Sequence, residues 1–156
     1  MAEEKKIGAI KEELQAAEDS MLPDFIARYE KDERSGVKSL VEKAGKRIQK
    51  LEAEYARIEN LKKYEKEYAD AGYICGIDEV GRGPLAGPVV AGAVILPKDC
   101  DILYINDSKK LSASMREKLY DEIMEKAVAT GIGMAGPGRI DEINILQATY
   151  EAMRQA

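Results

Sequence analysis

The first half of the chain contains a row of apolar residues whose spacing alternates between four and three positions. The row comprises Val37, Val41, Ala44, Ile48, Leu51, Tyr55 and Ile58, and it continues with Leu61, Tyr64 and Tyr68 toward Gly72. This spacing puts the residues on one face of an α-helix and predicts a long helix with a coiled-coil-like seam. Because one helix cannot bury such a seam alone, we expect it to fold against neighbouring elements.

Two shorter helices are predicted ahead of the long one. The first carries Ile7, Ile10 and Leu14 on one face, and the second begins or breaks at Pro23 and contains Phe25, Ile26 and Tyr29. Proline interrupts the interior of a helix but is accepted in its first turn. Residues 1–71 are therefore predicted to form an all-helical segment.

The hydrophobic pattern changes after Gly72 from a helical period to short apolar runs. Residues 74–78 predict a central strand, residues 89–96 a second strand and residues 102–105 a possible third. A helix over about 114–130, a strand over 132–135 and a helix from about residue 140 follow. The apolar face of that last helix is predicted to consist of Ile143, Leu146, Tyr150 and Met153. Residues 72–156 are therefore predicted to belong to an α/β domain.

Composition excludes several classes of function. With 45% hydrophobic and 34% charged residues the chain has a globular balance, and its longest apolar run, residues 89–96, is far shorter than the ~20 residues of a membrane span. The charged N-terminus is unlike a signal peptide, so we expect a cytoplasmic protein. The absence of histidine excludes His-based catalysis and His-ligated zinc, which leaves oxygen ligands and hence Mg²⁺ or Mn²⁺ for any metal site.

Charge is distributed unevenly along the chain. The net charge of -5 argues mildly against a nucleic-acid partner. Between Val37 and Lys66, however, nine basic residues face five acidic ones, which gives a local charge of +4. Local clusters matter more than the total for nucleic-acid binding, so such a partner stays open.

Two adjacent carboxylates, Asp78 and Glu79, end the first predicted strand beside a glycine-rich loop. Open α/β sheets bind ligands at the carboxyl ends of their strands. Neighbouring strand residues point to opposite faces, so both carboxylates can serve one site only if the strand leaves its pleat at Glu79. Taken alone, the pair is more typical of a solvated turn. The loop has neither GxGxxG spacing nor a P-loop ending.

The run Gly76–Ala91, which contains this pair, resembles the signature of the ribonuclease HII (type 2 ribonuclease H) family. Three further segments resemble that family in the same order: Asp107–Leu111, Gly131–Gly133 and Ile140–Ala148. The resemblance covers about residues 72–156. The helical N-terminal part resembles an extension found in some members.

This resemblance implies an RNase H-like mixed sheet flanked by helices, with four carboxylates around Mg²⁺ or Mn²⁺. Asp78 and Glu79 match the first two carboxylates, as catalytic residues and metal ligands. The implied substrate is an RNA–DNA hybrid or a DNA duplex with embedded ribonucleotides, cut by metal-activated water to leave a 3′-hydroxyl and a 5′-phosphate.

The implied substrate contacts lie in two segments. The backbone of Gly81, Arg82 and Gly83 would sense the ribose 2′-hydroxyl, and Ser108 and Lys109 would hold phosphates. Without the family match, Arg82 is as readily a structural salt-bridge residue, and Lys109 belongs to a solvated loop.

No segment of the chain matches the other two carboxylates of the family. We therefore expect a truncated form with little activity of its own, made of a helical extension (1–71) and the front part of a catalytic domain (72–156). A non-catalytic nucleic-acid-binding fragment and a helical interaction module are the alternatives. The full-length family implies a monomer.

Overall fold

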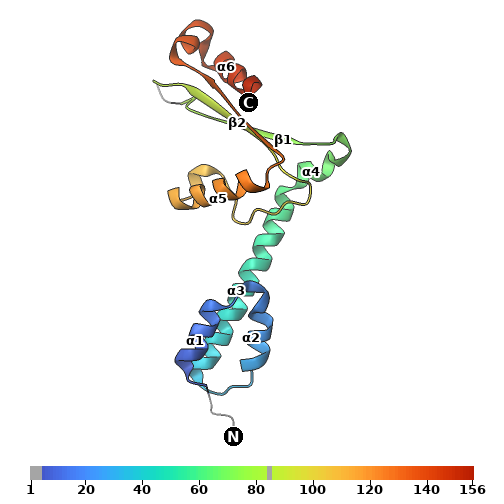
Figure 1. Ribbon diagram of the computed structural model, residues 1–156, viewed down its shortest axis with the longest axis vertical. Coiled ribbons are helices and arrows are strands. Elements are labelled where there is room, and N and C mark those ends of the chain that lie inside the picture. The colour runs from blue at the N-terminus through green and yellow to red at the C-terminus, as the bar shows by residue number, and fades with distance from the viewer. Residues whose placement is uncertain (1–4, 84–85) are drawn as a thin grey trace. The chain divides into compact units, whose positions relative to one another are not determined.

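The computed structural model describes residues 5–83 and 86–156 and divides the chain into two compact units, residues 1–59 (unit 1) and 60–156 (unit 2) (Figure 1). Each unit has a hydrophobic core of its own. Across the described ranges, no helix is both long enough and apolar enough to span a membrane.

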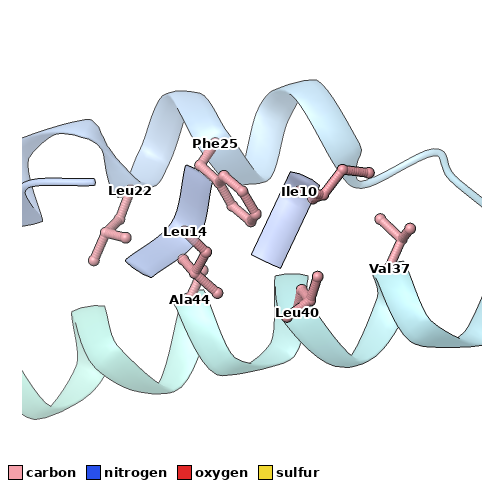
Figure 2. Packing of buried hydrophobic residues seen from close by; sticks show 7 residues of the cluster. All are labelled: Ile10, Leu14, Leu22, Phe25, Val37, Leu40 and Ala44. Carbon is pink, nitrogen blue, oxygen red and sulfur yellow. The ribbon is translucent and has the colours of Figure 1, made fainter. Parts of the chain in front are cut away.

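Unit 1 consists of helices that pack around one apolar core. Helices α1 (Ile7–Ala16) and α2 (Leu22–Tyr29), with the short 3-10 turn η1 (Asp19–Met21) between them, contribute to it together with the first half of α3 (Ser35–Leu61). Figure 2 shows the core side chains of all three helices pointing toward one another: Ile10, Leu14, Leu22, Phe25, Val37, Leu40 and Ala44. The predicted helices are thus confirmed, and Pro23 lies in the first turn of α2, where no backbone donor is needed.

The long helix ends earlier than its apolar row predicts. α3 stops at Leu61, and the short helix α4 (Lys63–Glu67) and the 3-10 turn η2 (Ala69–Ala71) follow before Gly72. Tyr64 and Tyr68 are 64% and 54% exposed, so burial does little to hold this part of the row in a continuous helix. Gly72, at φ +94°, then ends the helical segment in a conformation that favours glycine.

Unit 2 is built on a three-stranded antiparallel sheet, which confirms the α/β class. Its strands β1 (Cys75–Val80), β2 (Val89–Ile95) and β3 (Ala129–Ala135) lie in the order β1-β2-β3. The prediction that the first strand is central is wrong, because β2 takes that position and β1 lies at an edge of the described sheet. The possible strand at 102–105 is also wrong: Tyr104 adopts φ 67°, which no extended strand contains.

Two helices accompany the sheet. α5 (Ala113–Lys126) is capped by Ser112, whose hydroxyl accepts a hydrogen bond from the backbone N–H of Met115 (3.2 Å). The helix ends before the predicted residue 130 because β3 starts at Ala129. α6 (Pro137–Gln155) packs on β2 and β3. The core between α6 and these two strands consists of Val89, Ala91, Ala135, Ala148 and Ala152.

The buried face of α6 differs from the predicted one. Leu146 and Tyr150 are exposed, whereas Ala148 and Ala152 are fully buried. The cause is Asn144, whose non-helical backbone (φ 69°, ψ 164°) interrupts α6. Its side-chain oxygen accepts hydrogen bonds from the N–H groups of Leu146 and Gln147 (3.0 and 3.1 Å) and so starts a second helical stretch with a shifted face.

Candidate functional site

Asp78 lies on the face of the sheet that α6 does not cover. Its partner across the β1–β2 ladder is Gly92, whereas the neighbouring pair joins Glu79 to Ala91, which is buried in the α6 core. Since side chains alternate along a strand, Asp78 and Gly92 share the opposite face. Gly76, two residues earlier on β1, also lies on that face, so two of the positions flanking the exposed Asp78 carboxylate have no side chain.

Glu79 points away from Asp78, because β1 keeps its pleat. The ladder continues regularly through Val80 and Val90, so the departure from the pleat that a shared carboxylate site requires does not occur. The Glu79 side chain is 22% exposed and its Oε1 lies 3.6 Å from Nη1 of Arg82. The backbone N–H of Glu79 donates to Oδ1 of Asp78 (2.9 Å).

The loop that follows β1 contains three glycines, of which Gly81 and Gly87 have a positive φ and Gly83 does not. Gly81 has φ +89°, and a Cβ there would lie 2.3 Å from the carbonyl oxygen of Pro88, so only glycine allows the two ends of the β1–β2 connection to approach. A Cβ on Gly83 would meet open space. Arg82 is half exposed beside Glu79. Residues 84–85 of the signature lie outside the described residues.

Ser108 and Lys109 belong to an exposed, locally organised turn. They form the 3-10 turn η3 (Ser108–Lys110), in which the Asp107 carboxylate accepts a hydrogen bond from the backbone N–H of Lys109 (2.9 Å). Arg116 Nη1 donates to the carbonyl oxygens of Leu111 (2.7 Å) and Ser108 (3.3 Å). These contacts hold the turn to the start of α5 and leave the Ser108 and Lys109 side chains in solvent.

The donor set suits a hard cation but is incomplete in the part of the chain that the structure describes. Carboxylate oxygens are the ligands that Mg²⁺ and Mn²⁺ prefer. No group of three or more Asp, Glu, Cys or His residues is close enough together in residues 5–83 and 86–156 to surround an ion. The predicted residues thus provide Asp78 on one sheet face and Glu79 on the other, while Ser108 and Lys109 belong to a separate exposed turn, η3.

No sequence pattern indicated that glycines would lie beside Asp78. Gly92 reads as an interruption of an apolar strand, and only the antiparallel register brings it opposite Asp78. The sheet face of Asp78 also contains the exposed apolar residues Val80, Ile132 and Met134, and Ile132 is 76% exposed.

Two family models match the chain in sequence. The ribonuclease HII N-terminal domain matches residues 6–69, and ribonuclease HII matches residues 75–156. A ribonuclease HII of Lachnoclostridium phytofermentans is 62% identical over 151 residues, which cover 97% of this chain and 59% of that protein. The ribonuclease HII of Enterococcus faecalis is 50% identical over 158 residues, covering 100% of this chain and 61% of the relative.

Among solved structures, the ribonuclease H2 from Pyrococcus horikoshii is similar to this chain. It is 30% identical with a TM-score of 0.41, over 51% of this chain and 41% of that one. The chain spans about 60% of the length of the two curated relatives.

Proposed function

The chain belongs to the ribonuclease HII family, and from this premise we propose that it forms part of an endoribonuclease that cuts RNA joined to or paired with DNA. The substrates would be RNA–DNA hybrids and DNA duplexes with single embedded ribonucleotides, and the products a 3′-hydroxyl and a 5′-phosphate. The observation that carries the proposal is the match over residues 75–156, which includes Asp78 on an uncovered sheet face beside a glycine loop.

We assign metal binding to Asp78 and Glu79. A divalent ion such as Mg²⁺ or Mn²⁺ would supply an activated water and stabilise the leaving oxygen. Asp78 offers its carboxylate to solvent directly, with Gly92 and Gly76 leaving room for an ion that keeps several waters and substrate phosphate oxygens as ligands. Glu79 would take part only if the backbone of β1 left its pleat at this residue and the side chain released Arg82.

Substrate contacts are assigned to the loop after β1 and to turn η3. The fold does not require a glycine at position 83, where a Cβ would meet open space. The unobstructed backbone would let Gly81, Arg82 and Gly83 approach a ribose 2′-hydroxyl, the group that distinguishes RNA from DNA. Ser108 and Lys109 project from η3 and would hold a phosphate without reading sequence.

We also propose that the helical extension comprises residues 1–71, that the catalytic part begins at Gly72 and that the protein acts in the cytoplasm as a monomer. The two family matches, which meet between residues 69 and 75, support this boundary.

A second candidate is a nucleic-acid-binding fragment without turnover. The observation that favours it is the lack of a third acidic residue near Asp78 in the described ranges, since in-line attack on a phosphate uses ions held on both sides. Asp78 by itself holds one side. We therefore expect this chain to cut slowly by itself.

The proposal is tested with a labelled DNA duplex containing one ribonucleotide, incubated with Mn²⁺ and a large excess of protein so that slow cleavage is detected. We expect a single cut at the ribonucleotide, no cut in the all-DNA duplex and no cut by the Asp78→Asn variant. Equal cleavage by that variant, or of the all-DNA duplex, would contradict the proposal. Binding without any cleavage would favour the second candidate.

A further inference from the structure

A row of lysines runs along α3 on the side opposite the core of unit 1. The row consists of Lys43, Lys46 and Lys50. Each lysine follows an apolar residue of the packed side by two positions, these residues being Val41, Ala44 and Ile48. Two residues correspond to about 200° around a helix, so the lysines face away from the packed side. All three side chains are exposed, and the next row positions on either side, Ser39 and Ala53, are exposed and uncharged.

The positive charge of unit 1 is concentrated in residues 38–50 of α3. Residues 38–50 contain five basic residues and one acidic residue, a charge of +4. Residues 1–59 contain 12 basic and 14 acidic residues, a net charge of -2, so the remainder of unit 1 carries -6. A helix face that serves only to solvate a protein usually mixes both signs, whereas three lysines form this row and Glu42 is the one acidic residue within residues 38–50.

The lysines are also little engaged within the protein. Lys46 forms one ion pair with Glu42 (2.6 Å), in which both side chains are 66% exposed, and such a pair contributes little. Lys43 and Lys50 have no hydrogen bond or ion pair with any of the described residues. Arg47, by contrast, is held at the flank of the row by Asp19 (2.6 Å). Three ammonium groups are therefore available to an external anion.

We propose that this lysine row binds the phosphate backbone of duplex nucleic acid. From Lys43 to Lys50 the helix rises about 10.5 Å, which equals about three phosphate steps of 3.4 Å along one strand. Lysine contacts phosphate as a point charge and needs no base sequence, so the row suits a protein that must recognise a duplex by its backbone. The inference rests on the proposed function, because it assigns the helical extension to holding the same class of substrate.

The test measures how binding depends on salt. The full chain is titrated against a fluorescently labelled DNA duplex with one ribonucleotide, in EDTA to prevent cleavage, over a series of salt concentrations. The variant Lys43→Gln/Lys46→Gln/Lys50→Gln keeps helix propensity and removes the row. The matched control, Lys6→Gln/Lys11→Gln/Lys31→Gln, removes the same charge from other exposed positions of unit 1.

Each lost phosphate contact should reduce the slope of log affinity against log salt by about 0.9, so the row variant should lose up to about 2.7 and the single variant Lys50→Gln about 0.9. The control variant should keep the wild-type slope. Circular dichroism checks that all variants retain their helix content. Equal slopes for the row and control variants would overturn the inference, as would a wild-type chain that binds no duplex.

The Asp78→Asn variant separates this inference from the proposed function. It should bind with the wild-type slope in EDTA while failing to cut in Mn²⁺. If Asp78→Asn cuts normally, the proposed function fails, and the salt slopes still decide the role of the lysine row.

Discussion

Replacing Gly133 with alanine should push α6 away from the sheet. A Cβ at this position of β3 would lie 2.0 Å from the carbonyl oxygen of Ala152, 2.7 Å from Cβ of Gln155 and 2.8 Å from the backbone nitrogen of Ala156. Since a Cβ contact below 3.0 Å is essentially never observed, the helix must retreat by at least about 1 Å. Two of these contacts are with backbone atoms, which a change of side-chain rotamer cannot relieve.

The expected cost is large for the addition of one methyl group. Overpacking typically destabilises by about 1–3 kcal/mol, and here the retreat also loosens the fully buried Ala148 and Ala152, so we expect about 3 kcal/mol. For a domain of roughly 100 residues this lowers the melting temperature by more than about 10 °C. Hydrogen exchange of the β2 amides reports the opening of unit 2 specifically, and these amides should exchange faster by about a factor of 100.

Gly92→Ala is the matched control, because Gly92 lies in the same sheet and a Cβ there would meet open space. It should leave stability unchanged or raise it by about 0.4–1 kcal/mol through the unfolded chain. If Gly133→Ala and Gly92→Ala give the same protection of the β2 amides, α6 does not pack against β3 in this way and the reasoning is refuted.

Three further predictions concern the metal, the pH dependence and the helical core. Calorimetry should detect weak Mn²⁺ binding that Asp78→Asn removes, since this carboxylate is the one open to solvent on its sheet face; equal binding by the variant would count against the assignment. Hydrogen bonds from Lys5 and Tyr29 lower the pKa of Glu13, so their stabilisation is present above the ordinary pKa of 4.5 and is lost as the pH falls through the lowered value. Acid titration of helix content should therefore show a loss below about pH 4.5 that Glu13→Gln reduces, and an unchanged profile would exclude this cause. Phe25→Ala should destabilise unit 1 by about 3–5 kcal/mol in urea unfolding, because the ring is 3% exposed; a cost below about 1 kcal/mol would contradict the described core.

Sequence periodicity alone was sufficient to predict the helices of unit 1. The three predicted helices form, and Phe25 and Ala44 lie in the core where their spacing puts them. Helix formation and the burial of a regular stripe depend on residues three and four positions apart, which are close together in the sequence. The two strands around the glycine loop could also be predicted from residues close together in the sequence. The resemblance of the run Gly76–Ala91 to ribonuclease HII is confirmed by the family match.

Tertiary contacts decided the rest. α3 stops at Leu61 although its apolar row continues, because the exposed tyrosines beyond it gain little from a longer helix. The buried face of α6 follows from the break at Asn144 and from the flat surface that Gly131 and Gly133 present, which admits alanines more closely than leucine or tyrosine.

For the carboxylate pair, too, the sequence predicts one property and the tertiary structure decides another. Its position at the end of a strand beside a glycine loop could be predicted from sequence, since it depends on a few consecutive residues. Which face each carboxylate takes depends on the ladder with β2, where a shift of one residue exchanges the two faces. That register is fixed by the packing of Ala91 with Ala148 and Ala152 of α6, which lie more than fifty residues further along the chain. Asp78 therefore comes to lie opposite Gly92 on the open side of the sheet.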